Sequence, residues 1–181
     1  MRCRCLFLML TVLPTAVAQD TKAPAAEPEI QLAEDLAVLK PFLGTWEVNG
    51  QWSSGTKLWA RNIYRVGLNG RFVESSTFAK DGDGDVYERY RTVFAWDKKN
   101  DRFITHGFTY NGDVSTVELK TEKTDDGRAV LISEWSPDGS DAKISQRMEI
   151  IDAASYRWQV WSQRTPDAEK QEIMNAVWKR Q

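Results

Sequence analysis

The sequence has very little cysteine and histidine. Its two cysteines, Cys3 and Cys5, both lie in the first five residues, and His106 is its one histidine. Disulfides, thiolate metal sites and thiol catalysis are therefore excluded for the rest of the chain. A zinc site would need one imidazole and carboxylates alone, a poor ligand set for zinc. The folded part must be held together by its core.

Long hydrophobic runs are also absent. The one apolar stretch, residues 6–12, is too short to span a bilayer. It follows Arg2 and Arg4 and precedes Ala16-Val17-Ala18, a small-residue cleavage motif, so residues 1–18 are predicted to be a signal peptide. The protein is then exported, periplasmic or extracellular, with no transmembrane segment in the mature chain. The alternative is a retained membrane anchor.

Charge of one sign is not concentrated anywhere. The chain has 24 basic and 26 acidic residues, and two of the basic residues lie in the predicted signal. No block of Lys or Arg stands out, so nucleic acid is not predicted as a partner. About 163 residues follow the signal, which is enough for one domain that buries roughly two-thirds of its unfolded surface.

The segment after the signal is expected to be a flexible lead. Residues 19–28 are rich in Ala, Pro and Glu, a composition typical of unfolded chain. A short helix is predicted over residues 29–39, where apolar residues recur at helical spacing, and Lys40-Pro41 is expected to end it. The folded domain is predicted to cover residues 29–181.

Turn signals divide the rest of the chain into strands. Asn69-Gly70, Asn111-Gly112 and Asp126-Gly127 are dipeptides that favour tight hairpins, because their central residues adopt positive φ. Further Gly, Asp and Pro turns separate about ten short segments of alternating polarity. The predicted strands are residues 44–52, 57–66, 71–79, 86–97, 102–110, 114–121, 128–135, 143–151, 156–164 and 170–180.

These short links predict consecutive antiparallel neighbours. Ten strands in an open sheet would leave long edges, and closure into a barrel removes them. The fold class is therefore predicted as all-β, a single up-and-down antiparallel barrel of about ten strands with a short N-terminal helix. A two-sheet sandwich is the alternative, but its crossing connections usually need longer loops. A barrel of this size has room for a small ligand.

Alternation within each strand assigns one face to the interior. In the fourth strand Arg89 and Arg91 share a face, so the opposite face is expected to point inward. An aromatic interior with a few polar groups is typical of a small-molecule pocket. The alternative is a barrel filled by its own side chains, with its polar groups paired. The ligand-binding candidates are Phe72, Glu74, Glu88, Tyr90, Phe94, His106, Phe108, Gln146 and Trp158.

Three stretches carry a family resemblance. Phe42-Leu43-Gly44-Thr45-Trp46 resembles the Gly-x-Trp opening of the lipocalins and their calycin relatives. Val177-Trp178-Lys179-Arg180 is similar to their closing strand, and residues 70–74 and 90–97 look like a group of secreted bacterial proteins of unknown function with lipocalin-like barrels. The resemblance covers the chain from about Leu39 to its end. It implies a calycin-type barrel, which often holds an apolar ligand.

The resemblance also implies how the barrel closes. Gly44 would let the backbone turn inward, Trp46 would plug the end, and Arg180 or Lys179 would cover the Trp ring through a cation–π contact. The disulfide of many secreted lipocalins is missing. The strand count is closer to the fatty-acid-binding and nitrobindin-like barrels. Haem-binding relatives use a late histidine, and none follows His106, which argues against haem.

Catalytic motifs are weak. A Ser-His-Asp system would need His106, and the chain contains no Gly-x-Ser-x-Gly elbow. Glu74 and Glu88 could act as an acid–base pair if they shared a cavity, which gives a hydrolase or isomerase as one alternative function.

A calcium site is not predicted either. Asp81-Gly82-Asp83-Gly84-Asp85 looks like the start of a calcium loop. Val86 and Thr92 then stand where such a loop needs Gly and Glu. The stretch is better explained as a solvated hairpin tip.

The sequence thus predicts an exported, non-enzymatic barrel that binds a small apolar or amphipathic molecule. No catalytic residue, metal or cofactor is assigned. A structural or interaction domain with a packed core and an unidentified protein partner is the other alternative.

Overall fold

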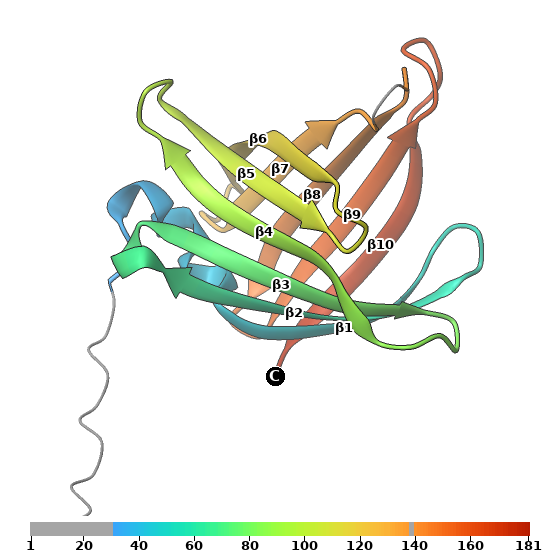
Figure 1. Cartoon of the computed structure of the whole chain (residues 1–181), viewed down its shortest axis with the longest axis horizontal. Coiled ribbons are helices and arrows are strands. Elements are labelled where there is room, and N and C mark those ends of the chain that lie inside the picture. The colour runs from blue at the N-terminus through green and yellow to red at the C-terminus, as the bar shows by residue number, and fades with distance from the viewer. Residues whose placement is uncertain (1–30, 138–139) are drawn as a thin grey trace, which may run out of the picture.

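The computed structural model describes residues 31–137 and 140–181, so the predicted signal (1–18) and lead (19–28) lie outside the described residues. Consecutive strands pair antiparallel and the last pairs with the first, which closes a ten-stranded barrel (Figure 1). The predicted fold class is confirmed. The strands are β1 (Gly44–Gln51), β2 (Lys57–Gly67), β3 (Phe72–Asp81), β4 (Tyr87–Asp97), β5 (Arg102–Thr109), β6 (Val114–Lys123), β7 (Ala129–Trp135), β8 (Lys143–Asp152), β9 (Ser155–Gln163) and β10 (Gln171–Arg180).

Strand positions follow the turn signals closely. Each strand begins and ends within two residues of its predicted bounds. Gly70, Gly112 and Gly127 have φ values of 83°, 94° and 82°. These angles are strained for residues with a Cβ atom, so the glycines fix where the chain reverses. The hairpins therefore set the register of the barrel.

The predicted helix differs in type and bounds. It is a 3₁₀ helix, η1 (Glu34–Phe42), that continues through Pro41. Its buried residues Leu36, Leu39 and Phe42 recur every three positions, which is the period of a 3₁₀ helix. A second 3₁₀ turn, η2 (Leu68–Gly70), precedes β3. No helix in the described ranges is long and apolar enough to cross a membrane.

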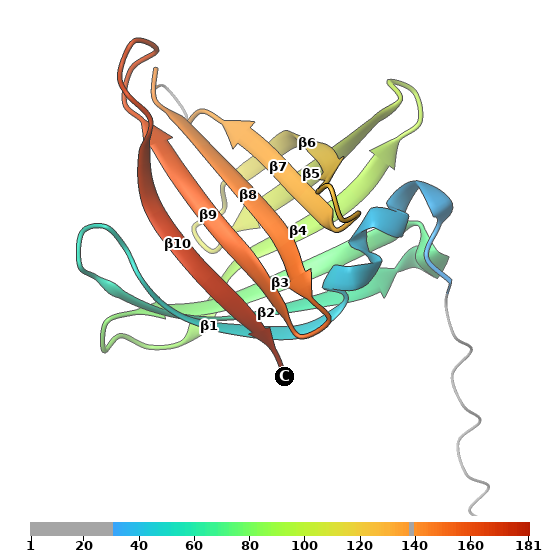
Figure 2. The same ribbon diagram turned by 180° about the vertical axis from the view of Figure 1, so that it is seen from behind.

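Helix η1 lies across one end of the barrel, where it contacts β3, β4 and β7 (Figure 2). The Phe42 ring packs against Tyr156 at 5.5 Å between centroids, and Tyr156 packs against Trp46 at 4.9 Å. Trp46 is fully buried, and its Nε1 donates a hydrogen bond to the Phe42 carbonyl at 2.6 Å. This aromatic cluster fills the η1 end of the barrel.

Arg180 covers this cluster from the last strand. Its guanidinium carbon lies 4.1 Å from the centre of the Trp46 ring. It donates hydrogen bonds to the carbonyls of Leu43 at 2.5 Å and Pro41 at 2.7 Å. Gly44 has φ +111°, and a Cβ atom there would lie 2.8 Å from Arg180 Nη1. The first and last strands are thus joined at this end.

Candidate functional site

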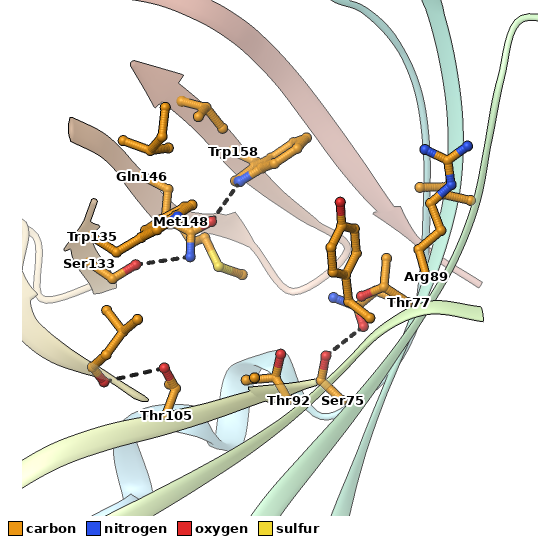
Figure 3. Close-up of a pocket in the computed structure, with 18 of the residues that line it drawn as sticks. Ser75, Thr77, Arg89, Thr92, Thr105, Ser133, Trp135, Gln146, Met148 and Trp158 are labelled. Atoms are coloured by element: carbon orange, nitrogen blue, oxygen red, sulfur yellow. Dashed lines mark hydrogen bonds between the residues drawn. The ribbon is translucent and has the colours of Figure 1, made fainter. Parts of the chain in front are cut away.

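The barrel encloses a cavity of about 500 Å³, lined by side chains of β2–β10 and the loop after β1 (Figure 3). This volume is in the range of small-molecule sites. The described part of the barrel is therefore not completely filled by its own side chains. The cavity lies beyond the aromatic cluster, toward the end of the barrel opposite η1.

Large apolar residues form one half of the cavity wall. They come from β7–β10 and from the loop after β1, and include Trp52, Trp135, Met148 and Trp158. The rings form a connected series: Trp52 meets Trp158 edge-on at 6.0 Å, and Trp158 meets Trp178 at 6.1 Å. This half offers flat apolar surfaces for a ligand to pack on.

A hydrogen-bonded group fixes the ring of Trp158 within this half. Trp158 Nε1 donates to Gln146 Oε1 at 3.1 Å, and Gln146 Nε2 donates to Ser133 Oγ at 2.9 Å (Figure 3). Both ends of the Gln146 amide are thus engaged by the protein. Gln146 lines the cavity as predicted, but its amide orients Trp158.

The other half carries small hydroxyl residues beside the apolar side chains of Phe94, Phe108 and Leu119. Ser75 and Thr77 come from β3, Thr92 from β4, Thr105 from β5 and Ser115 from β6. Figure 3 shows Ser75, Thr92 and Thr105 on the side of the cavity that faces Trp135 and Trp158. The cavity therefore has an indole half and a hydroxyl half.

The inner end of the cavity is polar but neutral. Ser75 Oγ donates to Asn62 Oδ1 at 2.8 Å, and both residues are buried. Burial raises the pKa of Tyr64 well above its usual value, and hydrogen bonds from Tyr156 and Asn62 offset this only in part. Burial also raises the pKa of Tyr156. Both phenols stay protonated at neutral pH and can donate or accept hydrogen bonds.

Arg89 is the one charged side chain among the described residues that line the cavity. The pairing of β3 with β4 shifts here, from Thr77 opposite Tyr90 to Phe78 opposite Glu88, so Arg89 is an extra residue in a β-bulge. A bulge turns the side chain that it inserts. Alternation had placed Arg89 outside, and the bulge brings it to the cavity wall near the ring of Tyr87, 5.0 Å away.

Five of the nine candidate residues line the cavity, and four do not. Tyr90 and Phe108 lie at its open end and are 48% and 42% exposed, whereas Phe94 is buried. The five lining residues are Tyr90, Phe94, Phe108, Gln146 and Trp158, and the four others are Phe72, Glu74, Glu88 and His106.

The prediction that Phe72 and Glu74 point inward is wrong, because the opposite face of β3 points into the barrel. Val73 is buried, and Ser75 and Thr77 line the cavity. Glu74 is exposed on the outside of the barrel.

Glu88 and His106 also lie on the outside. Glu88 forms an ion pair with Arg91 at 2.9 Å, and this hydrogen bond lowers the pKa of Glu88. His106 Nδ1 lies 2.9 Å from Thr116 Oγ1, across the outer face of β5 and β6. An acid–base pair of Glu74 and Glu88 needs a common cavity, and neither residue lines this one.

Several residues that line the cavity were not predicted from the sequence. They are above all Arg89 and the Ser and Thr residues of the hydroxyl half. The alternation of Ser75, Thr77 and Ala79 in β3 was visible in the sequence, but small polar residues are a weak sign of an interior face. A one-residue bulge leaves no reliable mark in a single sequence. Trp135 was recognised as a strand residue but not as part of a cavity.

No protein-family model matches the chain, and no curated protein sequence matches it either. Several solved structures resemble the chain at low sequence identity. A de novo designed fluorescence-activating β-barrel shows 14% identity over 82% of this chain and 100% of its own, with a TM-score of 0.43. A redesigned barrel, mFAP0, bound to DFHBI, shows 8% identity over 77% and 99%, with a TM-score of 0.41.

The third is the S-type phycobiliprotein lyase CPES from Guillardia theta. It shows 10% identity over 79% of this chain and 88% of its own, with a TM-score of 0.48. All three scores are below 0.5, so the function of this chain has to be inferred from its own residues.

Proposed function

We propose that this protein is a non-enzymatic binding protein that holds a small apolar or amphipathic molecule inside its barrel. The cavity of about 500 Å³ between an indole half and a hydroxyl half carries the proposal. A ligand that buries about 200 Å² of apolar surface there would gain roughly 5 kcal/mol from transfer out of water. The polar groups of the lining would orient it.

The charges of the side chains that line the cavity limit the chemical class of the ligand. Within the described lining no carboxylate faces the cavity, and the tyrosines at its inner end are neutral. A cation would find no counter-charge and would pay a desolvation cost on entry. An uncharged molecule fits this lining.

The proposal includes the place of the protein in the cell and its kinship. The signal-like segment 1–18 and the Gly44/Trp46/Arg180 closure support an exported, lipocalin-like carrier of the calycin kind. The ligand would then be loaded and released outside the cytoplasm without chemical change.

Native mass spectrometry of the protein purified from the exported fraction tests this function. We expect a stoichiometric adduct that is lost on denaturation and can then be identified. A chain that stays free of adduct, even after incubation with a total lipid and metabolite extract, would contradict it.

Exposed aromatic residues at the cavity mouth favour a second candidate function, docking of a protein partner. Tyr110 is 67% exposed and meets Tyr87 edge-on at 5.1 Å, next to Tyr90 and Phe108. Exposed apolar clusters of this kind often mark interaction sites. Cross-linking of the exported protein in its own cell extract, compared with Tyr110→Ser, tests this. Equal cross-linking of the wild-type protein and Tyr110→Ser would argue against docking at this surface.

A further inference from the structure

Three of the hydroxyl residues that line the cavity, Ser75, Thr92 and Ser115, lie in one lateral row. Ser75 of β3 is the Cα partner of Thr92 of β4, Thr92 pairs with Gly107 of β5, and Gly107 pairs with Ser115 of β6. All four residues line the cavity. Neighbouring strands are about 4.8 Å apart, so the row extends over roughly 14 Å of wall. We call these four positions the hydroxyl row.

Gly107 is the one position of the row without a side chain. A Cβ atom there would lie 2.8 Å from Ser115 Oγ. The Ser115 hydroxyl therefore occupies the space beside Gly107 and stays close to the wall. The absence of a side chain at Gly107 thus leaves room for the Ser115 hydroxyl at this end of the row.

The row also leads from the interior toward solvent. Ser75 is buried, Thr92 is half-buried and Ser115 is exposed. Across the cavity from it lie the indole rings of Trp135 and Trp158, and the ring of Trp158 is fixed by Gln146 (Figure 3). A molecule between these two walls meets flat apolar surface on one side, and on the other it meets hydroxyl groups among the rings of Phe94 and Phe108.

We propose that the ligand is a flat, uncharged ring molecule that carries oxygen acceptors along one edge. This rests on the function proposed above and specifies its ligand class. The indole half would hold the rings, and the hydroxyls of Thr92 and Ser115 would donate hydrogen bonds to the edge, since Ser75 already donates to Asn62. The row contains no charged group, so a charged edge would lose its hydration without compensation. Thr92 is then a specificity-determining residue.

A pair of probes that differ by one oxygen tests the proposal. 9-Fluorenone and fluorene share the same three fused rings, and fluorenone adds one carbonyl acceptor on the edge. Equilibrium dialysis gives the Kd of each probe for the full chain. We expect fluorenone to bind about fivefold more tightly, the ratio that ~1 kcal/mol of net hydrogen bonding gives.

Thr92→Val removes the hydroxyl and keeps the side-chain shape and the preference for a strand. We expect the fluorenone preference to fall to near one, with fluorene affinity within twofold of wild type. Thr116→Val makes the same chemical change on the outer face of β6 and should leave the preference intact. If Thr92→Val does not fold, Ser115→Ala removes a second hydroxyl of the row and should reduce the preference.

The outcomes separate the two proposals. If both probes bind wild type equally well, or if Thr92→Val weakens both alike, the hydroxyl row does not select the ligand although the cavity binds one. If neither probe binds wild type, the proposed function fails and the ligand class fails with it.

Discussion

The guanidinium of Arg180 lies 4.1 Å above the centre of the Trp46 ring and donates to the carbonyls of Leu43 and Pro41. One side chain of β10 therefore joins the aromatic cluster, the end of η1 and the start of β1. The η1 end of the barrel depends on this contact, and the cavity lies above it.

Arg180→Ala should destabilise the barrel by about 1–2 kcal/mol. The change removes the cation–π contact and leaves carbonyl oxygens without their donor. The loss of stability is limited because the Arg180 side chain is partly exposed to solvent. The midpoint of urea unfolding, followed by tryptophan emission, measures it. Lys179→Ala is the control, and an equal shift in both variants would show that Arg180 has no special role.

Gly44→Ala should also destabilise the barrel, by about 2 kcal/mol. The residue would have to adopt φ +111°, and its Cβ atom would lie 2.8 Å from Arg180 Nη1. Gly50→Ala is the matched control in the same strand, because a Cβ atom there meets its nearest atom, Ala176 Cβ, at 3.4 Å. Similar unfolding midpoints for the two variants would contradict this explanation.

The buried tyrosines predict a loss of stability in alkali. Burial raises the pKa of Tyr64 and Tyr156 above the unfolded value of about 10. Above pH 10 the unfolded chain therefore binds fewer protons than the folded chain, and stability falls by up to ~1.4 kcal/mol per pH unit for each group. The contribution of these two tyrosines to the free energy of unfolding is fully present below pH 10.

Tyr64→Phe isolates this effect. Urea unfolding at pH 8 and at pH 11 should show a smaller loss of stability between the two values for Tyr64→Phe than for wild type. Tyr110→Phe changes an exposed tyrosine and should behave like wild type. An equal loss in wild type and Tyr64→Phe would mean that the phenol of Tyr64 ionises freely in the folded protein.

The strand bounds and the closed barrel were predictable because local chemistry determines them. Asn69-Gly70 and Asn111-Gly112 mark reversals that only a few residue types tolerate. The lining was harder to predict. In β3 both faces alternate regularly, and Phe72 suggested the wrong one, whereas long-range pairing turned Ser75 inward. In β4 the bulge at Arg89 shifts the alternation by one residue, so Glu88 lies outside.

The central claim is that a small molecule binds inside the barrel. Its most direct test is titration of the protein with N-phenyl-1-naphthylamine, an uncharged probe that fluoresces in apolar surroundings. Thr77 lines the cavity, and Thr77→Phe would place a ring in that space. Thr116→Phe puts the same ring on the outer face of β6 and serves as the control.

We predict saturable binding of one probe per chain in wild type and in Thr116→Phe, and a loss of affinity of at least tenfold in Thr77→Phe, with all three proteins folded. Binding that is absent from folded wild type, or that is unchanged in Thr77→Phe, would contradict a ligand site inside the barrel.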